Sequence, residues 1–308
     1  MKKFNKLLTL ALILVLSMSL FGCTMPQDPT TPPVEPSGSP TGSTPPETLP
    51  DPIALNCGLD EYLAGEYGDV YLRINEDFEM TQTDNNTVLG NSNVTSIIIE
   101  GVGEDVKFTI KGGCYKAIMA YGNAKITFKN ITLVDETTEG GNWDMGWYLA
   151  FGGKIRFENC NLVTVIFLEN ADAEVVNCSV TSGNNASRYG LWLGAGAMNV
   201  QNSSFAGTRG IKICERQVDT ISNVTISGCT FDLSNRVGVS VSVVDETSVI
   251  KILNCSSEGI TPVSSDYDEG IDGLFEIGKK EGDYDVNLQI SGNKVAGVDV
   301  NEDNWYHN

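Results

Sequence analysis

The stretch KIRFENCNLV, Lys154–Val163, decides the fold of this chain. Apolar residues alternate at its start, Asn159 and Cys160 follow, and the apolar alternation resumes at Leu162. A period of two predicts β-strands on both sides of the Asn. The Asn itself indicates a tight bend, because Asn tolerates the left-handed backbone region better than other residues that carry a side chain.

The same pattern recurs along most of the chain. Its bend positions are Asn130, Asn159, Asn177, Asn202, Gly228, Asn254 and Gly292, separated by 29, 18, 25, 26, 26 and 38 residues. Such recurrence predicts a solenoid whose coils differ in loop length. If the coils stack at the strand spacing of about 4.8 Å, the Asn amides form a hydrogen-bonded ladder.

In a stacked solenoid the residue after each bend points inward. These inward residues are Ile131, Cys160, Cys178, Ser203, Cys229 and Cys255. Cysteines in one inward file are small, soft core residues, so we expect free thiols there. Cys57, Cys114 and Cys214 lie outside the file and could pair, which the sequence leaves open.

These strand–Asn–strand repeats resemble the right-handed parallel β-helix of the pectin-lyase-like superfamily. The segment NVTSIIIEGVGEDVKFTIKGG, from Asn93, is similar to the usual first coil of that fold. The resemblance implies an all-β, single-domain right-handed parallel β-helix solenoid over residues 93–308. Residues 55–92 would form its N-terminal cap.

The first residues predict export. Residues 1–22 combine a basic start with an apolar run, and Leu20–Cys23 resembles the lipobox of bacterial lipoproteins. The resemblance implies lipidation of Cys23; the alternative is an ordinary signal peptide with a chance Cys. Residues 24–54 hold almost all of the 11 prolines and predict a disordered Pro/Thr-rich tether. We therefore expect an exported protein, lipid-anchored to the bacterial cell membrane and facing the extracellular side.

The charge balance restricts the partners. The chain has a formal net charge of −20, and loss of Lys2, Lys3 and Lys6 would leave 17 basic and 40 acidic residues. This acidity argues against nucleic acid and against electrostatic docking on an anionic surface. The expected contact with a membrane is the lipid anchor alone, and we expect a monomer.

A binding site is predicted on one outward strip, where ligands of this superfamily usually lie. The strands after the long loops read GWYLAFG, VIFLENA, GLWLGAG, GIKICE and GVSVSVV. With Leu191, Leu193, Ile211, Ile213, Val239 and Val241 inward, alternation predicts an outward strip of Tyr148, Ile166, Trp192, Lys212 and Ser240. Arg188 and Arg209 precede two of these strands, and Asn142, Trp143 and Asp144 lie in a neighbouring loop.

Aromatic rings beside charges on a stiff β surface predict a polysaccharide site. Its candidate ligand-binding residues are Tyr148, Trp192, Trp143, Lys212 and Arg209. The alternative is that Trp192 and Tyr148 pack beneath loops.

Catalytic signatures are weak. The only histidine, His307, excludes histidine-dependent triads and zinc ligation. GLWLGAGAMNVQNSSF is similar to a pectin methylesterase segment, but Gly190 stands at the position of its nucleophile. GTRGIKI faintly resembles polygalacturonases without their paired aspartates. The candidate catalytic residues are Arg209, Lys212, Arg188 and Asp144, and an enzyme would require two of these, or of Glu169 and Glu215, to converge.

Two acidic clusters make Ca²⁺ the one candidate cofactor. Their members are Asp266, Asp268 and Asp272 in the first, and Asp299, Asn301 and Asp303 in the second.

The sequence thus predicts a surface-anchored lipoprotein that binds extracellular polysaccharide without catalysis. The first alternative is a polysaccharide lyase or glycoside hydrolase acting on an acidic, pectin-like glycan. The second is a structural, adhesin-like surface protein.

Overall fold

The described part of the chain is a parallel β-solenoid without helices. The computed structural model describes residues 53–54, 69–82, 87–89, 96–103, 105–112, 118–121, 125–137, 147–150, 153–181, 189–206, 209–214, 221–232, 238–241, 247–257, 275–277, 287–300 and 306–307. All of them belong to one compact unit, Thr48–Asn308. The described residues include no long apolar helix of the kind that crosses a membrane.

Each coil contributes one strand to each of three faces, and the described strands make nine coils. Face 1 contains β2 (Val70–Ile74), β5 (Ser96–Gly101), β8 (Lys125–Lys129), β11 (Lys154–Glu158), the second halves of β13 (Ile166–Val176) and β15 (Tyr189–Gln201), β18 (Ser222–Ser227), β21 (Val249–Leu253) and β24 (Asn287–Ser291).

Face 2 is a separate ten-stranded sheet. It contains β3 (Phe78–Gln82), β6 (Lys107–Gly112), β9 (Thr132–Thr137), β12 (Asn161–Val163), β14 (Ser179–Thr181), β16 (Ser204–Phe205), β19 (Thr230–Phe231), β22 (Ser256–Ser257) and β25 (Lys294–Val295), with β26 (Val298–Asp299) antiparallel to β25 at its edge.

Face 3 shares two long strands with face 1. It contains β4 (Thr87–Leu89), β7 (Ile118–Tyr121), β10 (Trp147–Ala150), the starts of β13 and β15, β17 (Arg209–Ile213), β20 (Val239–Val241), β23 (Phe275–Ile277) and β27 (Tyr306–His307). A short strand, β1 (Ile53–Ala54), pairs with β2.

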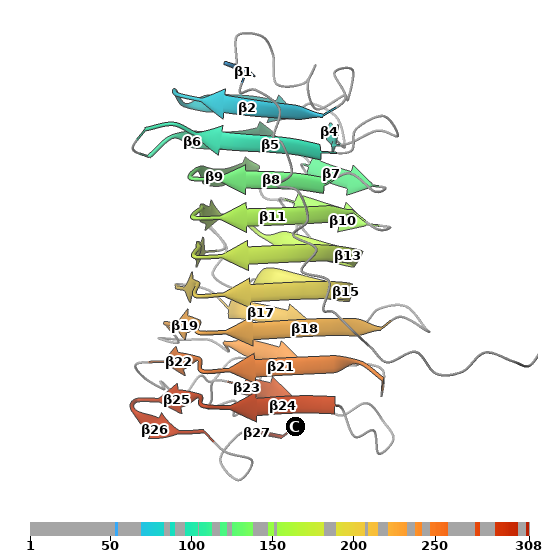
Figure 1. The fold of residues 1–308 in the computed structure, drawn as a ribbon, viewed down its shortest axis with the longest axis vertical. Helices are drawn as coiled ribbons and strands as arrows, with labels where there is room; N and C mark the ends of the chain where they lie inside the picture. Colours follow the sequence, from blue (N-terminus) through green and yellow to red (C-terminus); the bar gives the residue numbers. More distant parts are fainter. Residues whose placement is uncertain are drawn as a thin grey trace, which may run out of the picture. The chain divides into compact units, whose positions relative to one another are not determined.

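The solenoid is right-handed. In Figure 1 the face 1 strands run from right to left in front, the face 3 strands return behind them, and each coil lies below the one before it. The predicted all-β right-handed parallel β-helix is therefore confirmed. Its first coil, formed by β2, β3 and β4, stacks on the second within the residues expected to form a cap.

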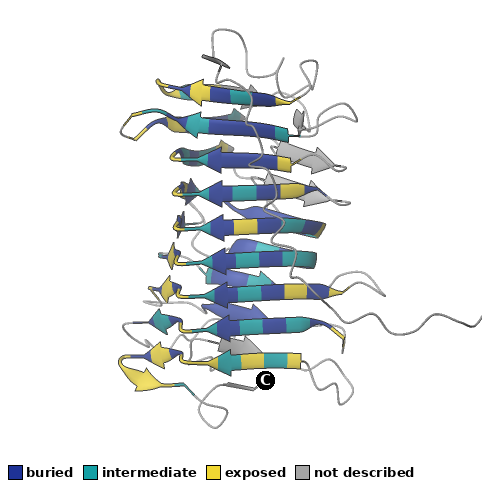
Figure 2. Ribbon diagram, viewed as in Figure 1, coloured by how far each residue is buried: buried dark blue, intermediate teal, exposed yellow. Residues whose placement is uncertain are grey.

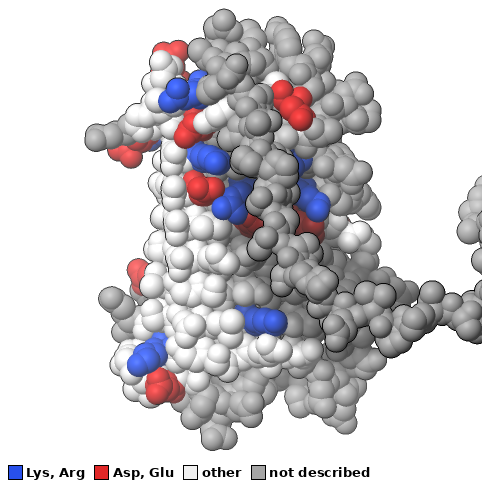
Figure 3. All heavy atoms as spheres, in the orientation of Figure 1, with Lys and Arg blue, Asp and Glu red and all other residues white. Residues whose placement is uncertain are grey.

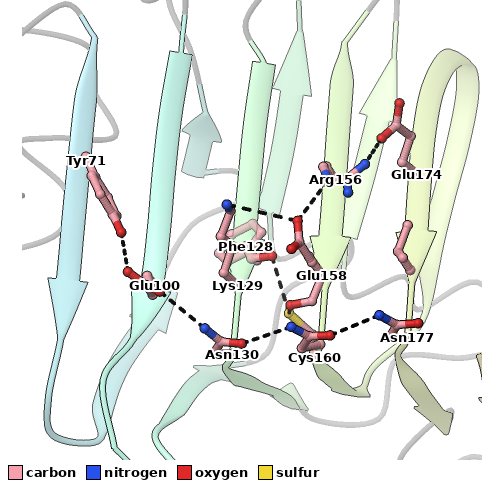
Figure 4. A network of polar contacts seen from close by, with 12 residues as sticks. Tyr71, Glu100, Phe128, Lys129, Asn130, Arg156, Glu158, Cys160, Glu174 and Asn177 are labelled. Carbon is pink, nitrogen blue, oxygen red and sulfur yellow. Dashed lines mark hydrogen bonds and ion pairs between the residues drawn. The ribbon is translucent and has the colours of Figure 1, made fainter. Parts of the chain in front are cut away.

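The Asn bends are confirmed as left-handed turns between faces 1 and 2. All five Asn residues, Asn130, Asn159, Asn177, Asn202 and Asn254, have φ between 49° and 55°. The Asn159 Nδ2 donates to Asn130 Oδ1 at 3.2 Å, and Asn177 Nδ2 donates to Asn159 Oδ1 at 3.3 Å. Figure 4 shows this ladder continuing to Glu100, which accepts from Asn130 Nδ2 at 3.2 Å.

Glycine at two of the bends has a further reason beyond backbone freedom. Gly228 has φ 61°, and a Cβ there would lie 2.6 Å from Asn202 Oδ1. Gly292 is related in the same way to Asn254, with φ 68°. Gly228 and Gly292 therefore make room for the Asn amide of the preceding coil, which the sequence argument had not anticipated.

The residue after each bend is buried, as predicted. The exposed fractions are at most 3 % for Ile131, Cys160, Cys178, Ser203, Cys229 and Cys255. The four cysteines are free thiols. Hydrogen bonding with Cys178, and then burial, raises the pKa of Cys160, and hydrogen bonding with Cys255, and then burial, raises that of Cys229. The Cys160 and Cys229 thiols are therefore held in their protonated form, whereas hydrogen bonding lowers the pKa of their partners Cys178 and Cys255.

Where the inward file has a polar residue in place of a cysteine, the polar side chain hydrogen-bonds to the backbone. The Cys178 N–H donates to Ser203 Oγ at 3.0 Å. One coil from the end, the Cys255 N–H donates to Asn293 Oδ1 at 2.7 Å, and Asn293 Nδ2 donates to the Ile252 carbonyl at 2.8 Å. Stacking therefore satisfies the buried polar side chains of Ser203 and Asn293, as low-dielectric interiors require.

Stacked side chains form the core. Phe128 and Phe157 lie 5.6 Å apart between ring centroids, and Phe205 and Phe231 lie 4.9 Å apart. Aliphatic residues of faces 1 and 3 fill the remaining space, and Figure 2 shows buried positions alternating with partly exposed ones along the front strands. The inward residues of the face 1 strands from β2 to β21 are buried and nearly all apolar, so the interior is alike along these coils, while the outward residues differ.

Candidate functional site

The register of face 3 places the predicted strip residues in one file, with one exception. Tyr148 pairs with Phe167, Phe167 with Trp192, Trp192 with Lys212, and Lys212 with Ser240. The prediction for Ile166 is wrong. It pairs with Trp147 and Leu191 and lies in the core at 1 % exposure.

The error at Ile166 is a shift of one residue. The segment Val165–Leu168 is apolar throughout, so alternation cannot tell which of its members face outward. Ile166 and Leu168 join the core cluster, and Phe167 takes the strip position. The predicted inward residues on the neighbouring strands, Leu191, Leu193, Ile211, Ile213, Val239 and Val241, are all buried.

The strip is less exposed than predicted. Phe167 is 0 % exposed and Ser240 is 2 % exposed. Trp192 and Lys212 between them are partly exposed. Among the members of this file whose side chains are described, the accessible ones are therefore Trp192 and Lys212, on β15 and β17.

Two aromatic residues and two cations gather on these strands. The Lys212 Nζ lies 5.3 Å from the centre of the Trp192 ring and 5.4 Å from that of Tyr189. The guanidinium carbon of Arg209 also lies 5.4 Å from the centre of the Tyr189 ring. We call Tyr189, Trp192, Arg209 and Lys212 the aromatic–cation cluster.

The β structure fixes the position of each member of this cluster. Tyr189 and Arg209 are register partners at the starts of β15 and β17, and Trp192 and Lys212 are register partners three residues later. Phe167 supports Trp192 in an edge-to-face contact, with the ring centroids 5.2 Å apart. Contacts of this geometry stabilise an aromatic pair beyond the area that it buries. Trp192 is thus held by the preceding strand, β13, and capped by the ammonium of the following strand, β17.

Tyr189 is the member that sequence reasoning missed. It lies 7 % exposed just before the GLWLGAG segment, which we began at Gly190. A signal was available, because Tyr189 and Arg209 stand at equal distances before the inward Leu191 and Ile211. Aligning the strand starts would have paired them.

The cluster offers binding groups and no evident acid–base pair. Cations and ring faces can hold a ligand by charge, hydrogen bonds and stacking. In the part of the chain that the structure describes, no three His, Cys, Asp or Glu side chains come together to hold a metal ion. Glu169 pairs with Ala150 and Ala195 in the register. Of the residues proposed to converge in an enzyme, the structure brings Arg209 and Lys212 to one ring, and because both are cations they do not form a carboxylate acid–base pair.

The other predicted site residues fall outside the described residues or away from the cluster. Those outside are Cys23, Asn142, Trp143, Asp144, Arg188, Glu215, Asp266, Asp268, Asp272, Asn301 and Asp303, as are Cys57 and Cys114. For Tyr148 only the strand position is described. Asp299 of the second acidic cluster lies on β26, where its Oδ1 is 3.6 Å from Lys294 Nζ. Its carboxylate therefore faces a cation of its own hairpin.

Comparison with known proteins adds no family to this geometry. No protein-family model, no curated protein and no solved structure matched the chain.

Proposed function

We propose that the protein binds an extracellular polysaccharide through the aromatic–cation cluster and does not transform it chemically. The observation that carries this proposal is the placement of Lys212 against both Trp192 and Tyr189, with Arg209 on the same tyrosine ring. The partly exposed Trp192 ring can cover the apolar face of a sugar ring, buried Tyr189 supports the cations from within, and the two cations can meet hydroxyl or carboxylate oxygens. Ligand sites typically combine aromatic surfaces with a small number of polar groups that converge on the ligand.

The scaffold supports a binding role. The cluster stands on paired strands of a stacked sheet, so its geometry exists before a ligand arrives and little conformational entropy is lost on binding. In a chain of net charge −20, two neighbouring cations also distinguish this place from the acidic remainder. We infer a preference for glycans that carry carboxylates, since the cations would pair with them.

The proposal includes the cellular setting. A lipid on Cys23 would anchor the mature chain, and residues 24–54 would hold the solenoid away from the membrane. Sequence resemblance supports this anchor, and the same kind of resemblance supports a relation to the pectin-lyase-like superfamily. The proposed partners are an extracellular polysaccharide and the membrane through the lipid alone.

Binding to immobilised polygalacturonate tests the proposal. The chain from residue 23, with Cys23→Ser to prevent lipidation, should bind, and Trp192→Leu should weaken binding at least about tenfold by loss of a stacking surface. Tyr71→Leu is the matched control, because Tyr71 is an aromatic residue of face 1. Equal binding by the Trp192→Leu and parent chains would contradict the proposal. Release of unsaturated uronates or reducing ends would replace it with the lyase or hydrolase alternative.

A further inference from the structure

Face 1 divides into two parts that differ in charge. Its first five coils carry nine outward charged residues, whereas its last four carry one, Lys251. Figure 3 looks at this face and shows the charged side chains gathered mainly over the upper coils. We call the outward residues of β18, β21, β24 and the second half of β15 the neutral half.

The neutral half is rich in amides and hydroxyls. Its polar residues include Asn199, Gln201, Asn223, Thr225, Gln289 and Ser291. Asn223 and Gln289 are exposed, and the others are exposed or partly so. The Gln201 Nε2 donates to Asn199 Oδ1 at 3.2 Å, so these two amides are already oriented. The surface continues around the ladder bend to exposed Ser204 and Thr230 on face 2.

We propose that the neutral half is a second binding surface, specific for an uncharged, linear glycan. Amides and hydroxyls both donate and accept hydrogen bonds, as sugar hydroxyls do, so the two surfaces complement each other without any charge. Coils repeat at about 4.8 Å, which is comparable with the advance of one sugar along an extended chain. A glycan lying along the solenoid axis would thus meet an equivalent polar set at each coil.

Other macromolecules fit this surface less well. A protein interface would need a well-packed aromatic or aliphatic centre, but Val249 and Leu253, the outward apolar residues on β21, are partly buried, and exposed Ile221 stands at the edge of the surface just before β18. Nucleic acid and anionic membranes would need several cations, and Lys251 stands by itself among the outward charges of these four strands. An acidic glycan would lack counter-charges for the same reason. On the described strands of the neutral half, the low charge therefore favours a neutral partner.

This surface is independent of the proposed face 3 site. The neutral half lies on face 1, and the aromatic–cation cluster belongs to the face 3 portion of β15 and to β17. A variant of either surface should leave the other unchanged. The failure of one proposal can therefore be told from the failure of the other.

Binding to immobilised cellulose, β-1,3-glucan, mannan and dextran tests the inference. The chain from residue 23 with Cys23→Ser should retain at least one of them. The triple variant Asn223→Ala, Thr225→Ala, Gln289→Ala should bind it at least about tenfold more weakly, because three net hydrogen bonds are removed. Asn223→Ala alone should act in the same direction, which covers the case that the triple variant fails to fold.

The controls decide the outcome. Lys125→Ala with Lys154→Ala changes two exposed residues of the charged coils and should leave neutral-glycan binding as it was. Trp192→Leu should also leave it unchanged while weakening polygalacturonate binding. Absence of binding to all four neutral glycans, or equal binding by the Asn223→Ala and parent chains, would overturn the inference. An equal loss of neutral-glycan binding in the variant with Lys125→Ala and Lys154→Ala would also overturn it.

Discussion

The first five coils of face 1, the upper coils in Figure 1, and its last four, the lower coils, have similar interiors and different surfaces. In the upper coils, outward charges of opposite sign stack across strands. The Arg156 guanidinium donates to Glu174 on one side and to Glu158 at 3.2 Å within its own strand, and Lys129 Nζ lies 4.0 Å from Glu158 (Figure 4). The lower coils present amides and hydroxyls at the same positions. Since the fold is kept in both, inward residues specify the solenoid and outward residues are free to serve binding.

The buried thiols give the largest expected effect, and each group of coils has one pair. Cys160 with Cys178 and Cys229 with Cys255 should react with a soluble disulfide reagent at least about 10³-fold more slowly in the native chain than in urea, because reaction needs an opening of the core. Hydrogen bonding and burial raise the pKa of Cys160 and of Cys229, so moving from pH 7 to pH 9 should restore little reactivity at these two thiols. Hydrogen bonding with the same two residues lowers the pKa of Cys178 and of Cys255, so the slow reaction of these two thiols is expected from their burial alone.

The thiol measurement is made residue by residue, by mass spectrometry of the labelled peptides. Partly exposed Cys214 is the internal control and should react in the native state. Rapid native labelling of one pair would show that its coils are not packed as described.

Removal of a core ring should cost the same in both groups of coils. Phe157→Ala and Phe205→Ala each delete a stacked, buried ring, and each should lower the free energy of unfolding by about 3–5 kcal/mol. Urea denaturation followed by circular dichroism measures both. A cost below about 1 kcal/mol at either position would mean that this part of the core is loosely packed.

The ladder bends should show a smaller cost. Asn177→Ala puts a residue without a side-chain amide at φ 54° and removes a ladder bond, so about 1–3 kcal/mol of stability should be lost. Asn177→Gly keeps the backbone angle accessible and should lose less. In the lower coils Gly228→Ala should be as harmful, because its Cβ would collide with Asn202. Similar stability of Asn177→Ala and Asn177→Gly would argue against the turn geometry.

Removal of a surface charge should give the smallest loss of stability, and this loss should occur in the upper coils only. Arg156→Gln breaks partly exposed ion pairs and should lower the free energy of unfolding by at most about 1 kcal/mol at low salt. This loss should become smaller in 0.5 M NaCl, where the screening length is about 4–5 Å. The effect of Asn223→Gln, in the neutral half, on the free energy of unfolding should not depend on salt. A salt-dependent effect of Asn223→Gln would contradict the difference in surface electrostatics between the two groups of coils.

Sequence periodicity predicted most of the fold, because the bend positions are chemically restricted. A left-handed turn accepts Asn or Gly, and a closed interior accepts small or apolar residues after it, so Asn159 and Cys160 mark a coil unambiguously. Alternation then placed Leu191 and Ile211 inward correctly. It failed at Ile166, where an unbroken apolar run removes the signal.

The candidate site was predictable only in part. The repeat predicts the register of β15 and β17, and it therefore places Trp192 beside Lys212, as the structure shows. Their mutual contact with Tyr189, and the burial of Phe167 and Ser240, depend on side-chain packing that alternation does not encode. The division of face 1 into a charged and a neutral part could be predicted only with the strand register, because the register brings residues from distant parts of the chain to one face.

Spin-label distances along one outward file test the stacking most directly. Thr132, Asn161, Ser179, Ser204, Thr230 and Ser256 are successive register partners on face 2. With one label at Thr132, in a chain whose Cys23, Cys57, Cys114 and Cys214 are serine, the second label is moved from Ser204 to Thr230 to Ser256. The stacked solenoid predicts distances that increase by about 4.8 Å per coil, to about 24 Å at Ser256. Distances that do not increase evenly with coil number would contradict it.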